Sequence, residues 1–418
     1  MLTDRGRALL ALGGLTYLAA WAFGSTPLYP VAVGLVLAVG LAALWVRMLR
    51  RPMRLNRSLW GGDHLAGDDI RMEVELESDA IQLPGALVMR EELERLGVFE
   101  GALARYHGSF VGRYTLRAVP RGRYAILKSQ IVIEDPFGLE RTEVDVWRGD
   151  ALLVYPRLVE VDRLFSDAGG RTPGGRRLLL HRTTGFELHS VRAYEQGESL
   201  RRVHWPSTAR RGELMVKELE DAPRDETAVL LDGDGAGVVG VAPDSTFELA
   251  VRAAGSILRA NAARGRRSAL ILSSRARLYQ PVQSLDADWS RALEVLAAVE
   301  PDGNLPIASV LADEAGPASR ALELTVVTSQ LTPRLVDRLL QRQVAHHGAS
   351  LVYVDPATFV EDGARTAEVD AQLLRLDRAG APVLVLRRGD DLAGRLRGVG
   401  EGASAAEVAI AAAGGGHA

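Results

Sequence analysis

The chain of 418 residues contains no cysteine, and lysine occurs only as Lys128 and Lys217. The absence of cysteine excludes disulfide bonds, thiol nucleophiles and zinc–thiolate sites, although it does not identify the redox compartment. The formal net charge is −3, so the chain lacks the basic excess that is typical of nucleic-acid-binding proteins. Its length is sufficient for two or three domains with sizeable cores.

Charge is also missing from two apolar runs, residues 8–24 and 28–46, and from the short link between them. Each run approaches the roughly 20 residues that a helix needs to cross a bilayer. Arg5 and Arg7 precede the first run. Further arginines follow the second run, at Arg47, Arg50, Arg51, Arg54 and Arg57.

Because arginine is enriched on the cytoplasmic side of membrane helices, this distribution predicts a transmembrane helical hairpin over residues 1–54. We expect a multi-pass protein of the plasma or inner membrane, bound to the lipid bilayer by two helices, with its soluble domains cytoplasmic. A cleaved signal peptide is the alternative for the first run, since a short basic region precedes it.

The pattern beyond the hairpin changes to period two, as in residues 70–78, where apolar and charged residues alternate. Such alternation is typical of a strand with one buried face. Similar segments at 112–126 and 128–140 are separated by Pro–Gly turns, so residues 55–160 are expected to form a small antiparallel β-sandwich. Residues 90–106 have a more helical pattern and are expected to form a helix inserted on a loop.

The C-terminal part is organised differently. Residues 161–225 are expected to hold a flexible linker, rich in Gly, Arg and Thr at 165–182, followed by a charged segment. In residues 226–392, apolar strands alternate with amphipathic helices, which predicts a parallel, doubly wound, Rossmann-type α/β domain with helices on both faces. Residues 393–418 are of low complexity and are expected to be a flexible tail.

Two carboxylates, Asp232 and Asp234, follow the first strand of this α/β region on a Gly-rich turn. Ligands of doubly wound sheets bind beyond the carboxyl ends of the strands. Paired carboxylates at that position can bind a hard cation such as Mg²⁺. The pair resembles two known sites: the Asp-x-Ser-x-Ser adhesion site of von Willebrand factor A domains and the Asp-x-Asp site of haloacid dehalogenase-like phosphatases.

Each resemblance is incomplete. Ala236 stands where the adhesion site has its second serine, so a metal site with Asp232, Asp234 and Thr328 would be degenerate. A phosphatase would use Asp232 as nucleophile and Asp234 as acid/base, yet no lysine follows Lys217 to hold the phosphate. Its strand-end hydroxyl would be Thr328 or Ser329, and its late acidic pair Asp390 and Asp391. A third interpretation is that the two aspartates only cap a turn.

The charged segment at residues 185–218 interleaves arginines with glutamates around Tyr194, His204 and Trp205. Mixed signs favour internally paired charges over a patch that binds phosphate or nucleic acid. The segment is therefore predicted to be a hinge or clamp between the sandwich and the α/β domain. A catalytic role for His204 is the alternative, although the sequence shows no serine–acid partnership for it.

The same segment resembles the signature of domain-of-unknown-function family 58, bacterial membrane proteins related to the von Willebrand factor A group. The matching positions that we single out are Gly185, Arg192, Tyr194, Gly197, Arg201, His204, Trp205, Arg210, Gly212, Lys217 and Glu218. Glu198, Val203 and Pro206 depart from the pattern.

The resemblance implies a von Willebrand factor A-like α/β domain and no established catalytic residues. Family members are often encoded beside a MoxR-type AAA+ ATPase and transglutaminase-like membrane proteins. We therefore expect a non-enzymatic scaffold or adaptor that binds such partners in cell-envelope assembly or stress response. A magnesium-dependent phosphatase that uses Asp232 and Asp234 is the alternative.

Overall fold

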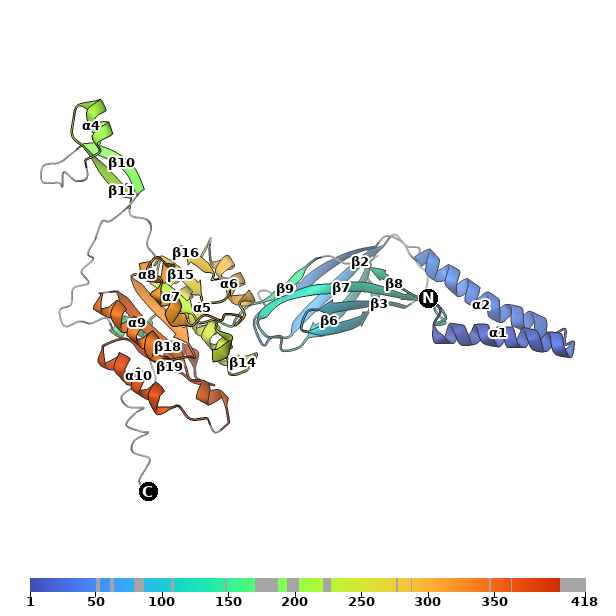
Figure 1. Cartoon of the computed structure of the whole chain (residues 1–418). Coiled ribbons are helices and arrows are strands. Elements are labelled where there is room, and N and C mark those ends of the chain that lie inside the picture. Colours follow the sequence, from blue (N-terminus) through green and yellow to red (C-terminus); the bar gives the residue numbers. More distant parts are fainter. Residues whose placement is uncertain are drawn as a thin grey trace, which may run out of the picture. The chain divides into compact units, whose positions relative to one another are not determined.

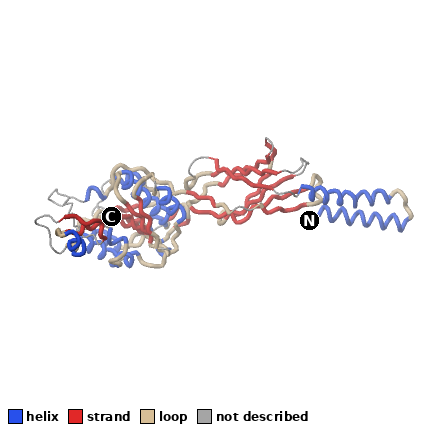
Figure 2. Tube along the Cα trace, turned by 90° about the horizontal axis from the view of Figure 1, so that it is seen from above, coloured by secondary structure: helices blue, strands red, loops and turns tan. Residues whose placement is uncertain are grey.

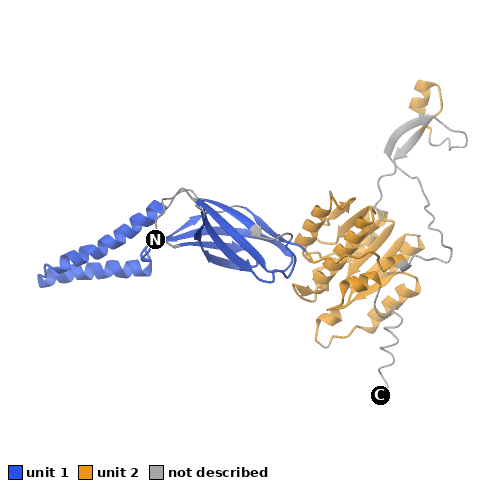
Figure 3. Ribbon diagram, turned by 180° about the vertical axis from the view of Figure 1, so that it is seen from behind, with its two compact units in different colours: residues 1–155 blue, residues 156–418 orange. Residues whose placement is uncertain are grey.

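The chain folds into two compact units, residues 1–155 and 156–418 (Figure 1, Figure 3). The computed structural model describes residues 1–49, 53–60, 64–78, 86–106, 109–146, 149–169, 187–193, 203–220, 227–275, 277–286, 288–345, 347–361 and 363–398. The predicted boundary at residue 160 lies inside the second unit. The predicted linker at 165–182 lies outside the described residues except for its start, where α3 (Ser166–Gly169) forms a short helix.

The first unit begins with a hairpin of two apolar helices, α1 (Asp4–Phe23) and α2 (Leu28–Leu49). Gly24 ends α1 with a φ of 65°, in the left-handed region that glycine adopts without strain. Leu15 and Leu41 are examples of apolar side chains that remain exposed on the hairpin. Both helices are long and apolar enough to cross a membrane, which suggests membrane anchoring.

The rest of the first unit consists of antiparallel strands (Figure 2). They form two sheets that enclose a common core. One sheet has the order β1-β2-β6-β5, formed by β1 (Met53–Trp60), β2 (Ile70–Ser78), β6 (Ser109–Leu116) and β5 (Ala104–Tyr106). The other has the order β4-β3-β7-β8, formed by β4 (Gly97–Ala102), β3 (Ala86–Leu93), β7 (Gly122–Glu134) and β8 (Arg141–Asp145). The strand β9 (Ala151–Val154) also pairs with β7.

The helix expected at residues 90–106 is wrong, because this stretch forms the end of β3 and the strands β4 and β5. In β3, Met89, Glu91 and Leu93 are all buried, so the strand does alternate. Its inward face carries a carboxylate at Glu91, which pairs with Arg57. Because a charged residue occupies the buried face, apolar and polar residues do not alternate along this strand, and its sequence does not show the pattern of a strand.

The second unit is a mixed α/β domain built on a six-stranded sheet of order β16-β15-β12-β17-β18-β19. Its strands are β12 (Thr227–Leu231), β15 (Ser268–Leu272), β16 (Tyr279–Val282), β17 (Glu323–Thr328), β18 (Gly348–Val354) and β19 (Val383–Leu386). Neighbouring strands are parallel except for the β15–β16 pair. The expectation of a fully parallel sheet is therefore wrong at one edge, where the short connection between β15 and β16 leaves no room for a crossover.

Helices cover both faces of this sheet, as the side chains of β12 show. Val229 and Leu231 pack into the core formed with α5 (Thr246–Ala263), α6 (Trp289–Ala298) and α11 (Leu392–Arg397). Ala228 and Leu230 pack into the opposite core, which is formed with α7 (Ile307–Ala312), α8 (Pro317–Arg320), α9 (Pro333–Val344) and α10 (Ala367–Arg378). Most of α11 lies in the stretch that the sequence assigned to a flexible tail, and residues 399–418 lie outside the described residues.

Candidate functional site

The two central strands of the α/β sheet bring Asp232 and Thr328 together. Asp232 directly follows β12, and Thr328 is the last residue of β17. The chain proceeds from β12 to β15 on one side, whereas β17 begins the other half of the sheet, so these strands flank the point where the strand order reverses. Ligands of doubly wound sheets bind at such a switch point. Here the Thr328 hydroxyl donates a 2.5 Å hydrogen bond to Asp232 Oδ2 across 96 positions of sequence.

The other carboxylate oxygen of Asp232 accepts a hydrogen bond from a residue at the end of a third strand. Ser273, which directly follows β15, donates from Oγ to Asp232 Oδ1 at 3.2 Å, and the Asp234 amide donates to the same oxygen at 3.2 Å. Ser273 Oγ also accepts from the Gly233 amide at 2.8 Å. Sequence reasoning missed Ser273, because two serines follow the strand at 268–272 and hydroxyl residues after a strand are common.

Asp232 is buried, with 8% of its surface exposed. Burial raises the pKa of its carboxyl group, while the hydrogen bonds from Thr328, Asp234 and Ser273 act in the opposite direction. Within the described part of the chain, no arginine or lysine forms an ion pair with Asp232. Asp355, at the end of β18, differs because Arg365 Nε lies 3.3 Å from its Oδ2. The partners of the Asp232 carboxylate in the described residues are thus hydroxyl and amide groups.

Asp234 has a local structural role. Its Oδ1 accepts from the Ala236 amide at 3.0 Å and caps the short 3-10 helix η2 (Gly235–Gly237). The following loop is fixed by the Ser329 hydroxyl, which donates to the Gly237 carbonyl at 2.6 Å. Gly303 packs closely against the same turn, because a side chain at this position would place its Cβ atom only 2.4 Å from the Ser273 carbonyl oxygen. The turn is therefore a tightly packed unit.

A magnesium ion fits these residues poorly. Both oxygens of Asp232 already accept hydrogen bonds, and Asp234 caps a helix. No group of three or more His, Cys, Asp or Glu side chains that could hold a metal occurs among the residues whose positions are described. The late acidic pair is elsewhere: Asp391 caps α11 beyond β19, and β19 is separated from β17 by β18. Two strand spacings separate the ends of β17 and β19 by about 10 Å.

The charged signature segment forms a hairpin of β10 (Glu187–Ala193) and β11 (Met215–Glu220), with the helix α4 (Trp205–Arg211) between them. The His204 amide donates to the Met215 carbonyl at 2.7 Å, and His204 Nδ1 lies 2.7 Å from Ser207 Oγ. Because Ser207 is in the first turn of α4, this pair stabilises the start of the helix. Gly212, with a φ of 73°, ends it. Trp205 is 66% exposed.

The remaining signature residues are distributed around this hairpin. Arg210 is exposed in the last turn of α4. Arg192, Lys217 and Glu218 lie on the paired strands, where Arg192 is opposite Val216 and Lys217 is opposite Val191. The other four positions lie outside the described residues: Gly185, Tyr194, Gly197 and Arg201. The interdomain clamp stays a prediction.

Comparison with known families matches residues 190–358 of the chain to the family described as "Protein of unknown function DUF58". This range contains most of the signature hairpin and the strands β12 to β18. The chain is also similar to the "Uncharacterized protein YeaD" of Bacillus subtilis, with 26% identity over 312 residues, 71% of this chain and 74% of that protein.

Two solved structures show only weak likeness. Cwp6 from Clostridium difficile has 9% identity and a TM-score of 0.20, with 79% of this chain and 45% of Cwp6 covered, so the match spans less than half of that protein. A conjugative transposon lipoprotein from Bacteroides eggerthii has 15% identity and a TM-score of 0.13, with 23% of this chain and 98% of the lipoprotein covered. Neither score relates the folds.

Proposed function

We propose that the chain is a membrane-anchored, cytoplasm-facing member of family 58 whose von Willebrand factor A-like domain presents an interaction surface to a MoxR-type AAA+ ATPase. In this role it acts as a scaffold or adaptor in cell-envelope assembly or stress response. The family match over residues 190–358 and the apolar helical hairpin support this proposal. The arginines that flank the outer ends of the hairpin support the cytoplasmic orientation.

The proposed von Willebrand factor A-like fold is supported by the sheet with helices on both faces. It is supported further by the position of an aspartate and a threonine at the switch point. The departure at Ala236 and the internal hydrogen bonds of Asp232 favour a surface that binds protein without a metal.

The observation that carries the proposal is the exposed loop beside the switch point, which we call the switch-point loop (residues 234–244). It contains no arginine or lysine, and its surface combines aspartates with small apolar residues. At its tip, β13 (Gly240–Val241) and β14 (Asp244–Ser245) form a short hairpin that leaves Val241 83% exposed. Arg388 Nε donates to Asp244 Oδ2 at 2.7 Å, so the carboxylate at the end of this hairpin is ion-paired. An exposed apolar tip is complementary to an apolar partner surface.

The site has less in common with a phosphatase. A phosphorylated substrate would meet two carboxylates at the switch point, and both oxygens of Asp232 already accept hydrogen bonds. Phosphoryl-transfer sites place cations against the transferred group. The switch-point loop supplies none, which favours protein binding over catalysis.

Co-purification from detergent tests the proposal, with the full-length chain as bait for the AAA+ ATPase encoded nearest to it, with and without ATP. We expect the ATPase to be retained, and Val241→Lys to weaken binding at least about tenfold, as for a central contact residue. Val344→Lys is the matched control, because Val344 is equally exposed at the end of α9, which precedes the amino end of β18, whereas the switch-point loop follows the carboxyl end of β12. No retention in either nucleotide state would contradict the proposal. Magnesium-dependent phosphatase turnover that Asp232→Asn abolishes would favour the alternative.

A further inference from the structure

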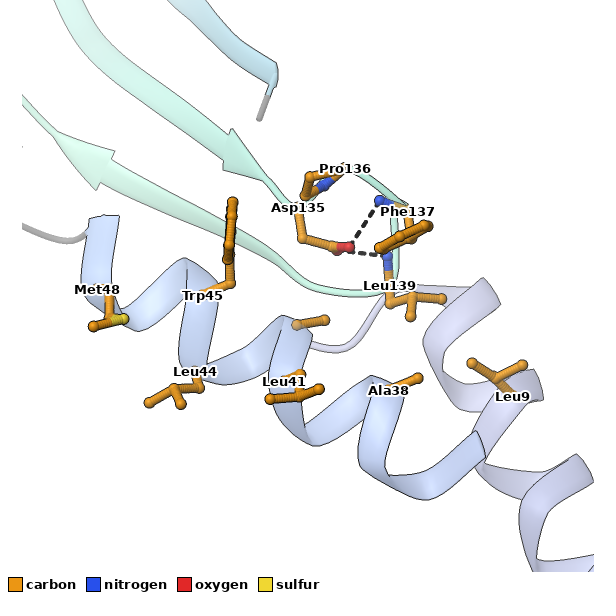
Figure 4. Close-up of a pocket in the computed structure, with 11 residues that line it drawn as sticks. Leu9, Ala38, Leu41, Leu44, Trp45, Met48, Asp135, Pro136, Phe137 and Leu139 are labelled. Atoms are coloured by element: carbon orange, nitrogen blue, oxygen red, sulfur yellow. Dashed lines mark hydrogen bonds between the residues drawn. The ribbon is translucent and has the colours of Figure 1, made fainter. Parts of the chain in front are cut away.

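An apolar groove lies within the first unit, between the helical hairpin and the turn that joins β7 to β8 (Figure 4). Its volume is about 610 Å³. The side chains that define it are Leu9 of α1, Leu41, Leu44, Trp45 and Met48 of α2, and Phe137 of the turn. Neither the proposed interaction with an ATPase nor the switch point uses this groove.

The turn that forms one wall is held in a single shape by Asp135, which is buried. Asp135 Oδ2 accepts from the Phe137 amide at 2.9 Å, and Oδ1 accepts from the amides of Leu139 and Glu140, both at 2.6 Å. Among the described lining residues, the one carboxylate is therefore engaged by backbone amides. The turn projects Phe137 outwards, with 76% of its surface exposed.

The turn is also bonded to the start of the first helix. The Thr3 amide donates to the Leu139 carbonyl at 3.1 Å, and Thr3 Oγ1 donates to the Gly138 carbonyl at 2.6 Å. Thr3 is the residue that caps α1, so the turn is fixed at the level where α1 begins. Leu139 packs with Val39 and Ala42 of α2, which fixes the turn against the second helix as well.

This attachment places Phe137 at a defined depth along the hairpin. The groove residues Leu44 to Met48 lie in the last turns of α2, which ends at Leu49. At 1.5 Å per residue, Trp45 lies about 6 Å from the end of the helix. Aromatic side chains at this position of membrane helices lie in the interfacial layer between lipid tails and water. Phe137 shares that level.

Given the membrane anchorage proposed above, we propose that this groove binds an acyl chain of a bilayer phospholipid and that the β7–β8 turn inserts Phe137 into the interfacial layer. The groove continues the lipid-facing surface of α2, since Leu41 and Met48 are both more than half exposed. Its lining is apolar apart from Asp135, which matches a hydrocarbon chain. The exposed Arg5 and Arg47 flank the same end of the hairpin, and the Arg5 guanidinium lies beside Gly138. These cations favour a lipid with an anionic head group.

The absence of cysteine allows a direct test, because a single introduced cysteine gives one labelled position in the full-length chain. The Phe137→Cys variant is labelled with an environment-sensitive fluorophore and reconstituted into nanodiscs that hold one chain each. The lipids have acyl chains brominated either near the head group or near the end. Leu15→Cys on α1 reports on the bilayer core. Val98→Cys on β4 is the matched control, because Val98 is also an exposed apolar residue, paired with Glu92 at the other end of β3.

We expect the label at position 137 to show blue-shifted emission and a loss of intensity with bromine near the head group. The label at position 98 should show neither. Lipids with anionic head groups should increase the quenching at position 137. Two results would overturn the proposal: emission at 137 that matches 98, or a blue shift without quenching, which would mean that protein fills the groove. If position 15 is also unquenched, the membrane anchorage itself fails, so the two failures are distinguishable.

Discussion

Replacing Glu91 by glutamine removes the negative charge from an ion pair inside the sandwich. Glu91 is fully buried, and Arg57 donates to its Oε1 from Nε at 2.8 Å. Ser129 donates to the same oxygen at 2.8 Å, and the Tyr114 hydroxyl donates to Oε2 at 2.6 Å. The substitution keeps the volume of the side chain. Among the described residues, it leaves the buried Arg57 with the half-exposed Asp150 as its one charged partner.

The magnitude follows from the burial of both groups. Removing one partner of a buried ion pair costs about 3–5 kcal/mol, because the remaining charge is left without compensation. Glutamine retains one acceptor oxygen, and Asp150 Oδ2 stays 2.6 Å from Arg57 Nη1, so the lower end of that range is expected. A loss of about 3 kcal/mol corresponds to roughly a hundredfold change in the opening equilibrium.

Hydrogen exchange measured by mass spectrometry on the full-length chain gives the assay. Amides in the paired strands β3 and β7 should exchange roughly a hundredfold faster in Glu91→Gln, whereas those of the α/β sheet should be unchanged. Glu92→Gln is the matched control, since Glu92 is the exposed neighbour on the same strand. Replacing both charges, with Arg57→Met and Glu91→Leu, should recover much of the protection.

Equal exchange rates in the Glu91→Gln and Glu92→Gln variants would refute this reasoning. So would a double variant that is less protected than Glu91→Gln. The first result would show that the Glu91 charge contributes nothing to stability. The second would show that packing or the hydrogen bond to Tyr114 dominates over the uncompensated charge.

The other predictions concern two buried groups whose pKa is raised. Burial raises the folded-state pKa of Asp232, so its ionised form costs stability at neutral pH and that cost disappears on acidification. In thermal unfolding at pH 7, Asp232→Asn should therefore be at least as stable as the wild type. The difference in stability should shrink as the pH falls, and destabilisation of the variant at every pH would contradict this. Magnesium and EDTA should leave the unfolding temperature of the wild type unchanged, and a magnesium-dependent increase that Asp232→Asn removes would show a metal site. Burial and then Glu91 raise the pKa of Tyr114, so its contribution is complete below about pH 10 and is lost as the pH rises further. Tyr114→Phe should lack this alkaline loss, and an unchanged pH profile in the variant would count against it.

The spacing of apolar residues along the chain determined which strands and helices could be predicted from the sequence. In the strand at residues 70–78, the apolar residues are the buried ones, so their alternation with charged residues predicted the strand. Continuous apolar runs predicted the buried strands of the α/β region in the same way. The strand β3 was missed because Glu91 occupies a buried position. The strand β16 was missed as well, because residues 279–282 include proline and glutamine and therefore lack a strand pattern. Its pairing with β15 depends on a short turn between the two strands.

The candidate site was predictable only where a general rule of topology applied. Asp232 was identified because ligands bind at the carboxyl ends of parallel strands, and Thr328 was proposed from the resemblance to known sites that carry a strand-end hydroxyl. Ser273 was missed, since hydroxyl residues after a strand are common and nothing in the sequence distinguishes this one. The internal hydrogen bonds of Asp232, which weigh against a metal, depend on distances that no motif encodes.

The last turn of α2 has a practical consequence for anyone who handles this protein. Leu49 belongs to the sandwich core, and Trp45 packs against that core from the same helix. Cutting the chain after the hairpin to obtain a soluble fragment would remove part of the interior and leave an apolar opening where Leu49 was. A fragment that retains the final turn of α2 would keep the interior closed, but it would carry an apolar end that promotes self-association. The natural place to divide this protein is therefore between its two compact units, and the end of the helical hairpin is the wrong place to cut.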